Sequence, residues 1–196
     1  MFYENVDPGA LKIDSRELSA RLGAPITDGE IKETEIYLAT ENAAHPSYVA
    51  VRANLSRENG VLLIENHKTH SRALGKVCEN SEECILLVAT LGVGVDRLIA
   101  RQSSISAHKG FLADAMADAL IEALCDYAED KLCQGLDTSG RFSPGYADLE
   151  LEFGRVILSL TDAERRLGIK LTEGGMMVPR KSVSAIIAVK GAQVRE

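Results

Sequence analysis

The sequence lacks a basic excess, a long apolar run and a recognisable secretion signal. Its 196 residues carry a formal net charge of -7, and no basic stripe of the kind that contacts nucleic acid occurs. No apolar run reaches the roughly 18 residues that a transmembrane helix needs. The N-terminal residues lack the basic and apolar regions of a signal peptide. We therefore expect a cytoplasmic protein with neither a nucleic-acid nor a membrane partner.

Metal-binding patterns are also missing. The cysteines form no Cys-x2-Cys pair, and the histidines do not complete a metal site around them. His67 and His70 lie close together, but the polar segment 65–70 that contains them is typical of an exposed loop. In a reducing cytoplasm we expect free and partly buried thiols at all the cysteines, which are Cys78, Cys84, Cys125 and Cys133.

The sequence does contain enough apolar material for one full core. Hydrophobic residues make up 45% and charged residues 26% of the chain, as in ordinary globular domains. We predict a single α+β domain over residues 1–196, with a mostly antiparallel sheet and flanking helices that include one long helix. Periodicity and turn signals predict helices over 15–22 (capped by Ser15), about 28–43 (capped by Thr27 or Asp28), 71–78, 95–102, 106–134, 150–160 and 161–167, and strands over 48–55, 61–64, 84–90, 170–179 (broken by a double glycine) and 182–189.

The long helix predicted over 106–134 has one apolar and one acidic side. The apolar side, expected to face the core, consists of Leu112, Met116, Leu120, Leu124 and Tyr127. Carboxylates recur every fourth residue on another side, at Asp114, Asp118, Glu122 and Asp126. Like charges at this spacing repel one another unless a partner answers them. The row is either a solvated face or the place where one carboxylate receives the ammonium or ribose hydroxyls of a ligand.

The segment 140–146, Gly-Arg-Phe-Ser-Pro-Gly-Tyr, follows that helix and is the most informative part of the chain. Pro144 and Gly145 predict a type II turn, because proline fixes φ and glycine tolerates the positive φ needed next. The turn is expected to fold Arg141 and Tyr146 toward one another. A guanidinium grips a carboxylate through two hydrogen bonds, and a phenol offers a flat face, which suits a small zwitterionic ligand with a ring. The alternative is an ordinary surface arginine beside a turn.

A glycine-rich turn, Gly92-Val93-Gly94, connects the apolar strand 84–90 to the helix after it. Backbone N–H groups at such a turn can hold an anion. The dinucleotide fingerprint is incomplete, however, and the P-loop Gly-Lys-Ser/Thr sequence is missing. Tight packing of the turn is the favoured interpretation, and contact with a ligand is the other.

The order of these segments resembles the activation domain of cobalamin-dependent methionine synthase. The pieces that carry the resemblance are Asp118 on the long helix, Arg141 with Pro144-Gly145-Tyr146, then Leu171-Thr172-Glu173, Met177 with Pro179, and Ser182-Val183-Ser184. The resemblance covers about residues 110–190, with a fainter echo in Thr90-Leu91-Gly92 and Val95-Asp96, whereas about residues 1–80 diverge.

The resemblance implies a site for S-adenosylmethionine. Arg141 would grip the methionine carboxylate, Tyr146 would line the same site, and Phe142, Pro144 and Gly145 would complete the segment. Asp118 stands where the family usually has a glutamate, so its side chain is one methylene shorter. Backbone near Met177 and Pro179 is implied to pack against the ligand, whereas Ser182 and Ser184 are expected to serve the fold. The chain itself would supply no catalytic residue and no metal ligand.

The same resemblance implies that cobalamin is carried by a partner. The corrinoid-binding motif Asp-x-His-x-x-Gly is absent from this chain. The partner would be a cobalamin-binding methionine synthase lacking this domain, or another corrinoid protein, and an electron donor such as a flavoprotein would reduce its cob(II)alamin. The chain would then act as a reactivation component that is not active alone. The alternative is a docking or regulatory subunit of a corrinoid methyltransferase system that binds no nucleotide, while a hydrolase has no catalytic group to rest on.

Overall fold

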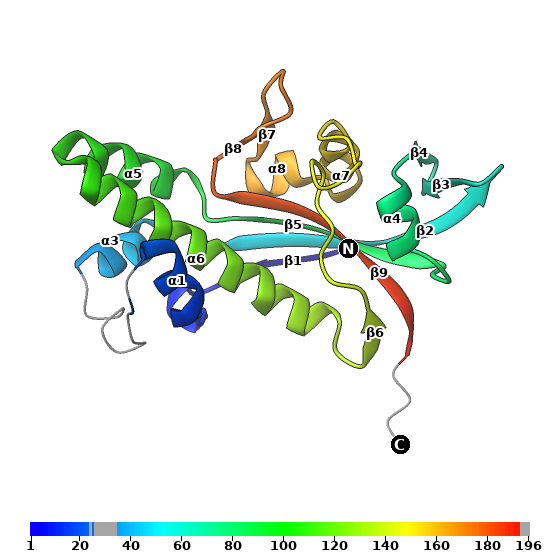
Figure 1. Ribbon diagram of the computed structural model, residues 1–196, viewed down its shortest axis with the longest axis horizontal. Helices are drawn as coiled ribbons and strands as arrows, with labels where there is room; N and C mark the ends of the chain where they lie inside the picture. The colour runs from blue at the N-terminus through cyan, green and yellow to red at the C-terminus, as the bar shows by residue number, and fades with distance from the viewer. Residues whose placement is uncertain (24, 26–34, 193–196) are drawn as a thin grey trace.

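A seven-stranded antiparallel sheet forms the centre of the protein (Figure 1). The computed structural model describes residues 1–23, 25 and 35–192. The strands follow the order β4-β3-β2-β5-β9-β6, with β1 paired to the free half of β2, and a separate small sheet consists of β7 and β8. The strands are β1 (Phe2–Asn5), β2 (Ser47–Glu58), β3 (Val61–Ile64), β4 (His67–Thr69), β5 (Glu83–Thr90), β6 (Leu136–Thr138), β7 (Lys170–Leu171), β8 (Met177–Val178) and β9 (Ser182–Ala192).

Helices cover both faces of this sheet. The described helices are the short 3-10 helix η1 (Pro8–Ala10) and the α-helices α1 (Ser15–Leu22), α3 (Glu35–Ala43), α4 (Arg72–Val77), α5 (Val93–Ile105), α6 (Ala107–Leu132), α7 (Phe153–Thr161) and α8 (Ala163–Leu167). In Figure 1 the 26-residue helix α6 crosses one face diagonally, while α7, α8 and α4 lie along the upper side. The prediction of an α+β domain with one long helix is confirmed.

The alternation of side chains along the strands divides the core into two layers. In β5, Ile85 and Leu87 belong to the cluster that packs against α6, whereas Leu86 and Val88 belong to the cluster that packs against α7 and α8. All four side chains are buried. This explains why residues 84–90 form a continuous apolar run rather than an alternating pattern, because both faces of the strand are covered.

The glycine-rich turn before α5 is a packing device. Gly92 has a φ of 79°, and a Cβ atom added at Gly94 would lie 2.2 Å from the carbonyl oxygen of Ala43 at the end of α3. Only glycine therefore allows the start of α5 to approach α3 this closely. The interpretation of tight packing agrees with this geometry.

Several predicted boundaries need correction. The cap of α1 is Asp14, whose carboxylate accepts a hydrogen bond from the Arg16 amide at 2.8 Å, rather than Ser15. The cap expected at Thr27 or Asp28 lies outside the described residues. The segment expected to be a loop around His67 contains strand β4, although both His67 and His70 are exposed. Strand β1 was not predicted, because its residues are mostly exposed and show no apolar alternation.

The cysteines are free thiols, three of them buried and Cys133 partly buried. Burial raises the pKa of Cys125 to about 12 and that of Cys78 to about 11, so neither forms an appreciable thiolate at neutral pH. Within residues 1–23, 25 and 35–192 no group of three or more His, Cys, Asp or Glu side chains is placed so that it could hold a metal ion. None of the helices described is both long and apolar enough to span a membrane.

Candidate functional site

Arg141 reaches helix α6 because of how the next residue pairs with the sheet. Phe142 forms an isolated bridge with Ile186 of β9, in which each amide donates to the other residue's carbonyl at 2.9 and 2.8 Å. Neighbouring residues in extended backbone project to opposite faces. The Phe142 ring therefore enters the core layer beneath α7, and the Arg141 side chain turns to the opposite face, where α6 lies.

Three carboxylates of α6 hold the Arg141 guanidinium. Nη1 donates to Asp126 at 2.7 Å and to Glu129 at 2.8 Å, and Nη2 donates to Glu122 at 3.0 Å. The Arg141 side chain is only 21% exposed. Burial alone would lower its pKa, but the hydrogen bond and ion pairs with these acids outweigh burial and leave the pKa raised. The guanidinium is thus a permanent, half-buried cation surrounded by more negative charge than it balances.

Lys181, which the sequence analysis did not single out, forms ion pairs with Asp114 and Asp118, the first two carboxylates of the α6 acidic row. Its ammonium lies 2.6 Å from Asp118 Oδ1 and 3.0 Å from Asp114 Oδ1, and its side chain is 8% exposed. Arg21 of α1 approaches Asp118 from the other side at 3.3 Å. The carboxylates of the row are therefore paired with cations of the protein, although their side chains remain partly exposed. The one available signal was a lysine directly before Ser182-Val183-Ser184.

The predicted turn is present, but it does not direct Arg141 and Tyr146 toward one another. Gly145 has a φ of 86°, and the Tyr146 amide donates to the Ser143 carbonyl at 3.1 Å, as a type II turn requires. The Tyr146 ring instead meets Phe142 edge-on, with centroids 5.5 Å apart. Tyr146 packs on the same side of the chain as Phe142, whereas Arg141 points to the opposite face of the sheet, so the two side chains point in different directions. Tyr146 remains 68% exposed and free to contact a ligand.

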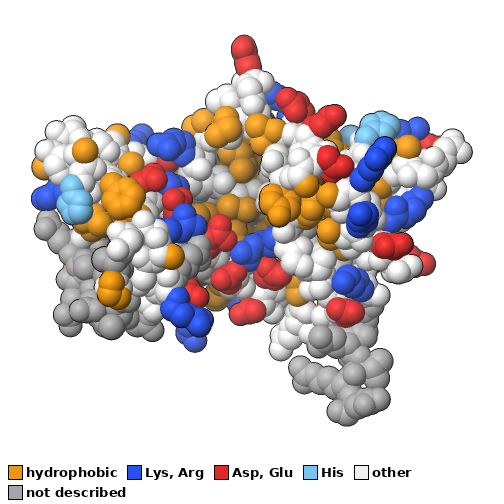
Figure 2. All heavy atoms as spheres, in the orientation of Figure 1, with side chains coloured by type: hydrophobic (Ala, Val, Ile, Leu, Met, Phe, Trp, Pro, Cys, Tyr) orange, Lys and Arg blue, Asp and Glu red, His pale blue; other side chains and the backbone are white. Residues whose placement is uncertain are grey.

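A small hollow joins segments that are far apart in the sequence. Its volume is about 160 Å³, and its lining includes Pro144 from the turn, Gly175 and Met177 from the β7–β8 hairpin, and Ser182 and Ser184 from β9. Pockets for small ligands usually measure about 300–1,000 Å³. The hollow can therefore enclose part of a nucleoside-sized ligand, and the rest would lie outside it. Figure 2 shows acidic and basic side chains gathered over the middle of α6, beside a hollow with hydrophobic side chains in its depth.

Comparison with known proteins identifies the family. The model of the vitamin B12 dependent methionine synthase activation domain matches residues 75–193 of the chain. The chain belongs to this family. The solved structures include a similar one, the MetH reactivation domain bound to AdoHcy, with a TM-score of 0.70 and 17% sequence identity. That match covers 100% of this chain and 79% of the other, and at this identity it shows the fold alone. A comparison with curated proteins gave no match.

The matched part of this activation domain includes every residue that the sequence analysis placed in the site. Asp118 belongs to the α6 acidic row, whereas Arg141 contacts that row from segment 140–146, and the two side chains bind different partners. Pro144 lines the small hollow, Gly145 shapes the turn, and Phe142 is buried beneath Tyr146. The ligand contacts of these residues remain predictions.

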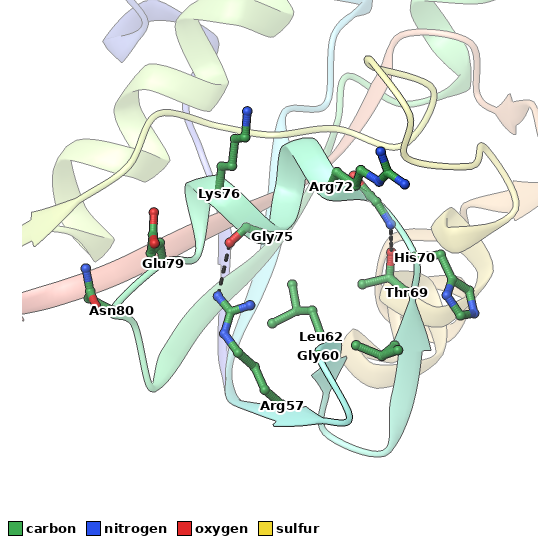
Figure 3. A pocket seen from close by; sticks show the side chains of 12 residues that line it. Arg57, Gly60, Leu62, Thr69, His70, Arg72, Gly75, Lys76, Glu79 and Asn80 are labelled. Carbon is green, nitrogen blue, oxygen red and sulfur yellow. Dashed lines mark hydrogen bonds between the residues drawn. The ribbon is translucent and has the colours of Figure 1, made fainter.

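A larger hollow of about 720 Å³ lies at the other end of this activation domain, between α4 and strands β2 to β4 (Figure 3). It is lined by several cations, but they do not converge on one point. Arg57 donates to the carbonyls of Gly75 and Cys78 at 3.0 and 3.2 Å, which caps the end of α4. In Figure 3 the charged groups of Lys76 and Arg72 point away from that of Arg57. We therefore assign Arg57 a structural role and place no site in this hollow.

Asp148 ties the loop after the Pro144-Gly145 turn to the scaffold. Its carboxylate accepts hydrogen bonds from the Ser71 hydroxyl at 2.5 Å and from the amides of Arg72 and Ala73 at 2.8 and 3.2 Å. The Ser71 hydroxyl and then the Arg72 amide are the main causes of a lowered Asp148 pKa. The start of α4 thus anchors the segment that carries Arg141 and Tyr146.

We expect Asp148→Ala to loosen this loop, with faster proteolytic cleavage within residues 143–150 at neutral pH. Because the folded-state pKa is lowered, the stabilisation is complete above the ordinary value of 3.8 and is lost as the pH falls through the lowered value. The difference in melting temperature between wild type and variant should therefore shrink as the solution is acidified below that value. Glu150→Ala, which removes an exposed carboxylate from the same loop, is the matched control. Equal cleavage of all three proteins would contradict the anchoring role.

Proposed function

We propose that the chain binds S-adenosylmethionine and presents its methyl group to a cobalamin carried by a partner protein. The observation that carries the proposal is the half-buried Arg141, which lies in the same segment as Tyr146. This segment belongs to the part of the chain that matches the activation-domain family. The related MetH reactivation domain is bound to AdoHcy, the demethylated form of this ligand. In this proposal residues 1–196 form one functional unit, including the divergent residues 1–80.

The guanidinium would change partners when the ligand binds. The methionine carboxylate takes two of the hydrogen-bond positions that α6 carboxylates now occupy on Arg141. A carboxylate released in this way, at Glu122 or Asp126, would then be available to receive the ligand's ammonium group. Asp118 is less suited to that role than the sequence suggested, because Lys181 and Arg21 already bind it. Tyr146 would cover the ligand with its exposed ring.

The protein's own contribution is to position the ligand. A reduced cobalamin on the partner would supply the nucleophile for the methyl group, and the electron pair of the broken methyl–sulfur bond would stay on sulfur in the product S-adenosylhomocysteine. The electron that prepares the cobalt comes from a reductant such as a flavoprotein. No group of this chain needs to donate or accept a proton in the transfer. Fixing both ends of the methionine moiety holds the methyl group in line with the incoming cobalt.

The test supplies methyl-labelled S-adenosylmethionine, a chemical reductant and a cobalamin-loaded methionine synthase that lacks its own activation domain. We expect label on the corrinoid only when this chain is present, and much less with Arg141→Ala. Physical association with the corrinoid protein, without transfer of label and without S-adenosylmethionine binding, would instead identify a docking or regulatory subunit. A different corrinoid protein is the next partner to test in that case.

A further inference from the structure

Lys181 is a buried cation in a place where the proposed ligand brings a cation of its own. Lys181 directly precedes Ser182, the first residue of β9, which lines the small hollow together with Pro144. Its ammonium crosses to α6 and lies 2.6 Å from Asp118, one helical turn before Glu122, which binds Arg141 at 3.0 Å. The four residues from Asp118 to Glu122 correspond to about 6 Å along the helix axis. Lys181 and Arg141 therefore contact adjacent parts of the same acidic row.

The charges around this row do not balance. Asp114, Asp118, Glu122, Asp126 and Glu129 supply five carboxylates, and Lys181, Arg141 and Arg21 are the three cations that contact them among the described residues. S-adenosylmethionine carries a sulfonium in addition to its carboxylate and ammonium groups, so it has a net positive charge. S-adenosylhomocysteine has lost the sulfonium charge with the methyl group and is neutral overall. A negative excess attracts the first ligand more than the second.

We propose that Lys181 is a specificity-determining residue, which limits how strongly the site prefers cationic S-adenosylmethionine over neutral S-adenosylhomocysteine. The inference rests on the proposed function, and it concerns the ratio of the two affinities rather than binding itself. The buried ammonium neutralises Asp118, the carboxylate one helical turn before Glu122, and its positive charge repels the sulfonium of a ligand bound at Arg141. The two ligands share all other groups, so a purely structural role of Lys181 would change both affinities together and leave their ratio unchanged.

The experiment measures the dissociation constants of both ligands by calorimetry for wild type and Lys181→Met, which removes the charge and keeps an unbranched apolar side chain. We expect the preference for S-adenosylmethionine to rise about twofold to fifteenfold. This is roughly the range that Coulomb's law gives for two unit charges at an assumed separation of about 10 Å, with dielectric constants of about 80 for water and about 20 for the protein. Higher salt should reduce the increase. Lys181→Arg, which keeps the charge, should retain the wild-type ratio.

A second variant guards against misfolding, because Lys181→Met leaves Asp114 and Asp118 without their buried partner. Asp118→Asn removes one negative charge and should lower the preference for S-adenosylmethionine. The double variant Lys181→Met with Asp118→Asn restores the local charge and should return the ratio toward that of wild type. An unchanged ratio in the folded variants would overturn the inference while leaving the proposed function intact. Absence of binding of either ligand to wild type would overturn both.

Discussion

Arg141→Ala should weaken S-adenosylmethionine binding by about 2 kcal/mol or more, which is about thirtyfold in the dissociation constant. The Arg141 side chain is 21% exposed, and its guanidinium is paired with Glu122, Asp126 and Glu129. These contacts fix its position before the ligand arrives. Removing it takes away the carboxylate's partner and also leaves three neighbouring anions unanswered near that carboxylate. Calorimetric titration of the purified variant measures the loss directly.

Three further variants separate the effects of charge, folding and geometry on ligand binding. Arg141→Lys keeps the positive charge but loses the planar pair of donors, so we expect an intermediate affinity. Arg165→Ala removes an exposed arginine that pairs with Asp162 on the opposite helical layer and should bind the ligand as wild type does. Tyr146→Ala changes a side chain that is 68% exposed, so it should weaken binding without lowering the melting temperature. Wild-type affinity in folded Arg141→Ala would remove Arg141 from the site.

Gly94→Ala should destabilise the protein by about 1–3 kcal/mol or more, because the added methyl group meets backbone rather than a movable side chain. Its Cβ would lie 2.2 Å from the Ala43 carbonyl oxygen, so α5 and α3 must move apart. For a chain of this size each 1 kcal/mol lowers the melting temperature by about 2–4 °C. Thermal unfolding followed by circular dichroism measures the change.

Gly75→Ala is the matched control for this effect. Gly75 lies within helix α4, and a Cβ atom added there would meet nothing within 4 Å. Alanine favours the helix more than glycine, so this variant should be as stable as wild type or more stable by up to about 1 kcal/mol. A Gly94→Ala protein with wild-type stability would show that the contact between α5 and α3 relaxes at little cost.

The elements that could be predicted from sequence are those whose pattern is local. The continuous apolar run 84–90 identified β5, and helical spacing identified α6. By contrast, β1 becomes a strand only because the first half of β2 offers it an unpaired edge. The strand conformation of β4 likewise depends on its pairing with β3, which no local sequence pattern predicts.

The candidate site shows the same division. The type II turn at Pro144 and Gly145 was predictable because proline and glycine encode its dihedral angles. The direction of the Arg141 side chain was not, because it depends on the bridge between Phe142 and Ile186. Lys181 could not be paired with Asp118 from sequence either, since the two residues are 63 positions apart and meet only when β9 and α6 pack together. Family resemblance marked the segments, and the tertiary structure determined their partners.

The most direct test of the central claim is a calorimetric titration of the folded wild-type protein with S-adenosylmethionine, first alone and then with a cobalamin-loaded partner lacking its activation domain. We predict saturable binding that is strongly reduced in Arg141→Ala and retained in Arg165→Ala. Absence of S-adenosylmethionine binding under both conditions would contradict the claim that this chain is an S-adenosylmethionine-binding reactivation module.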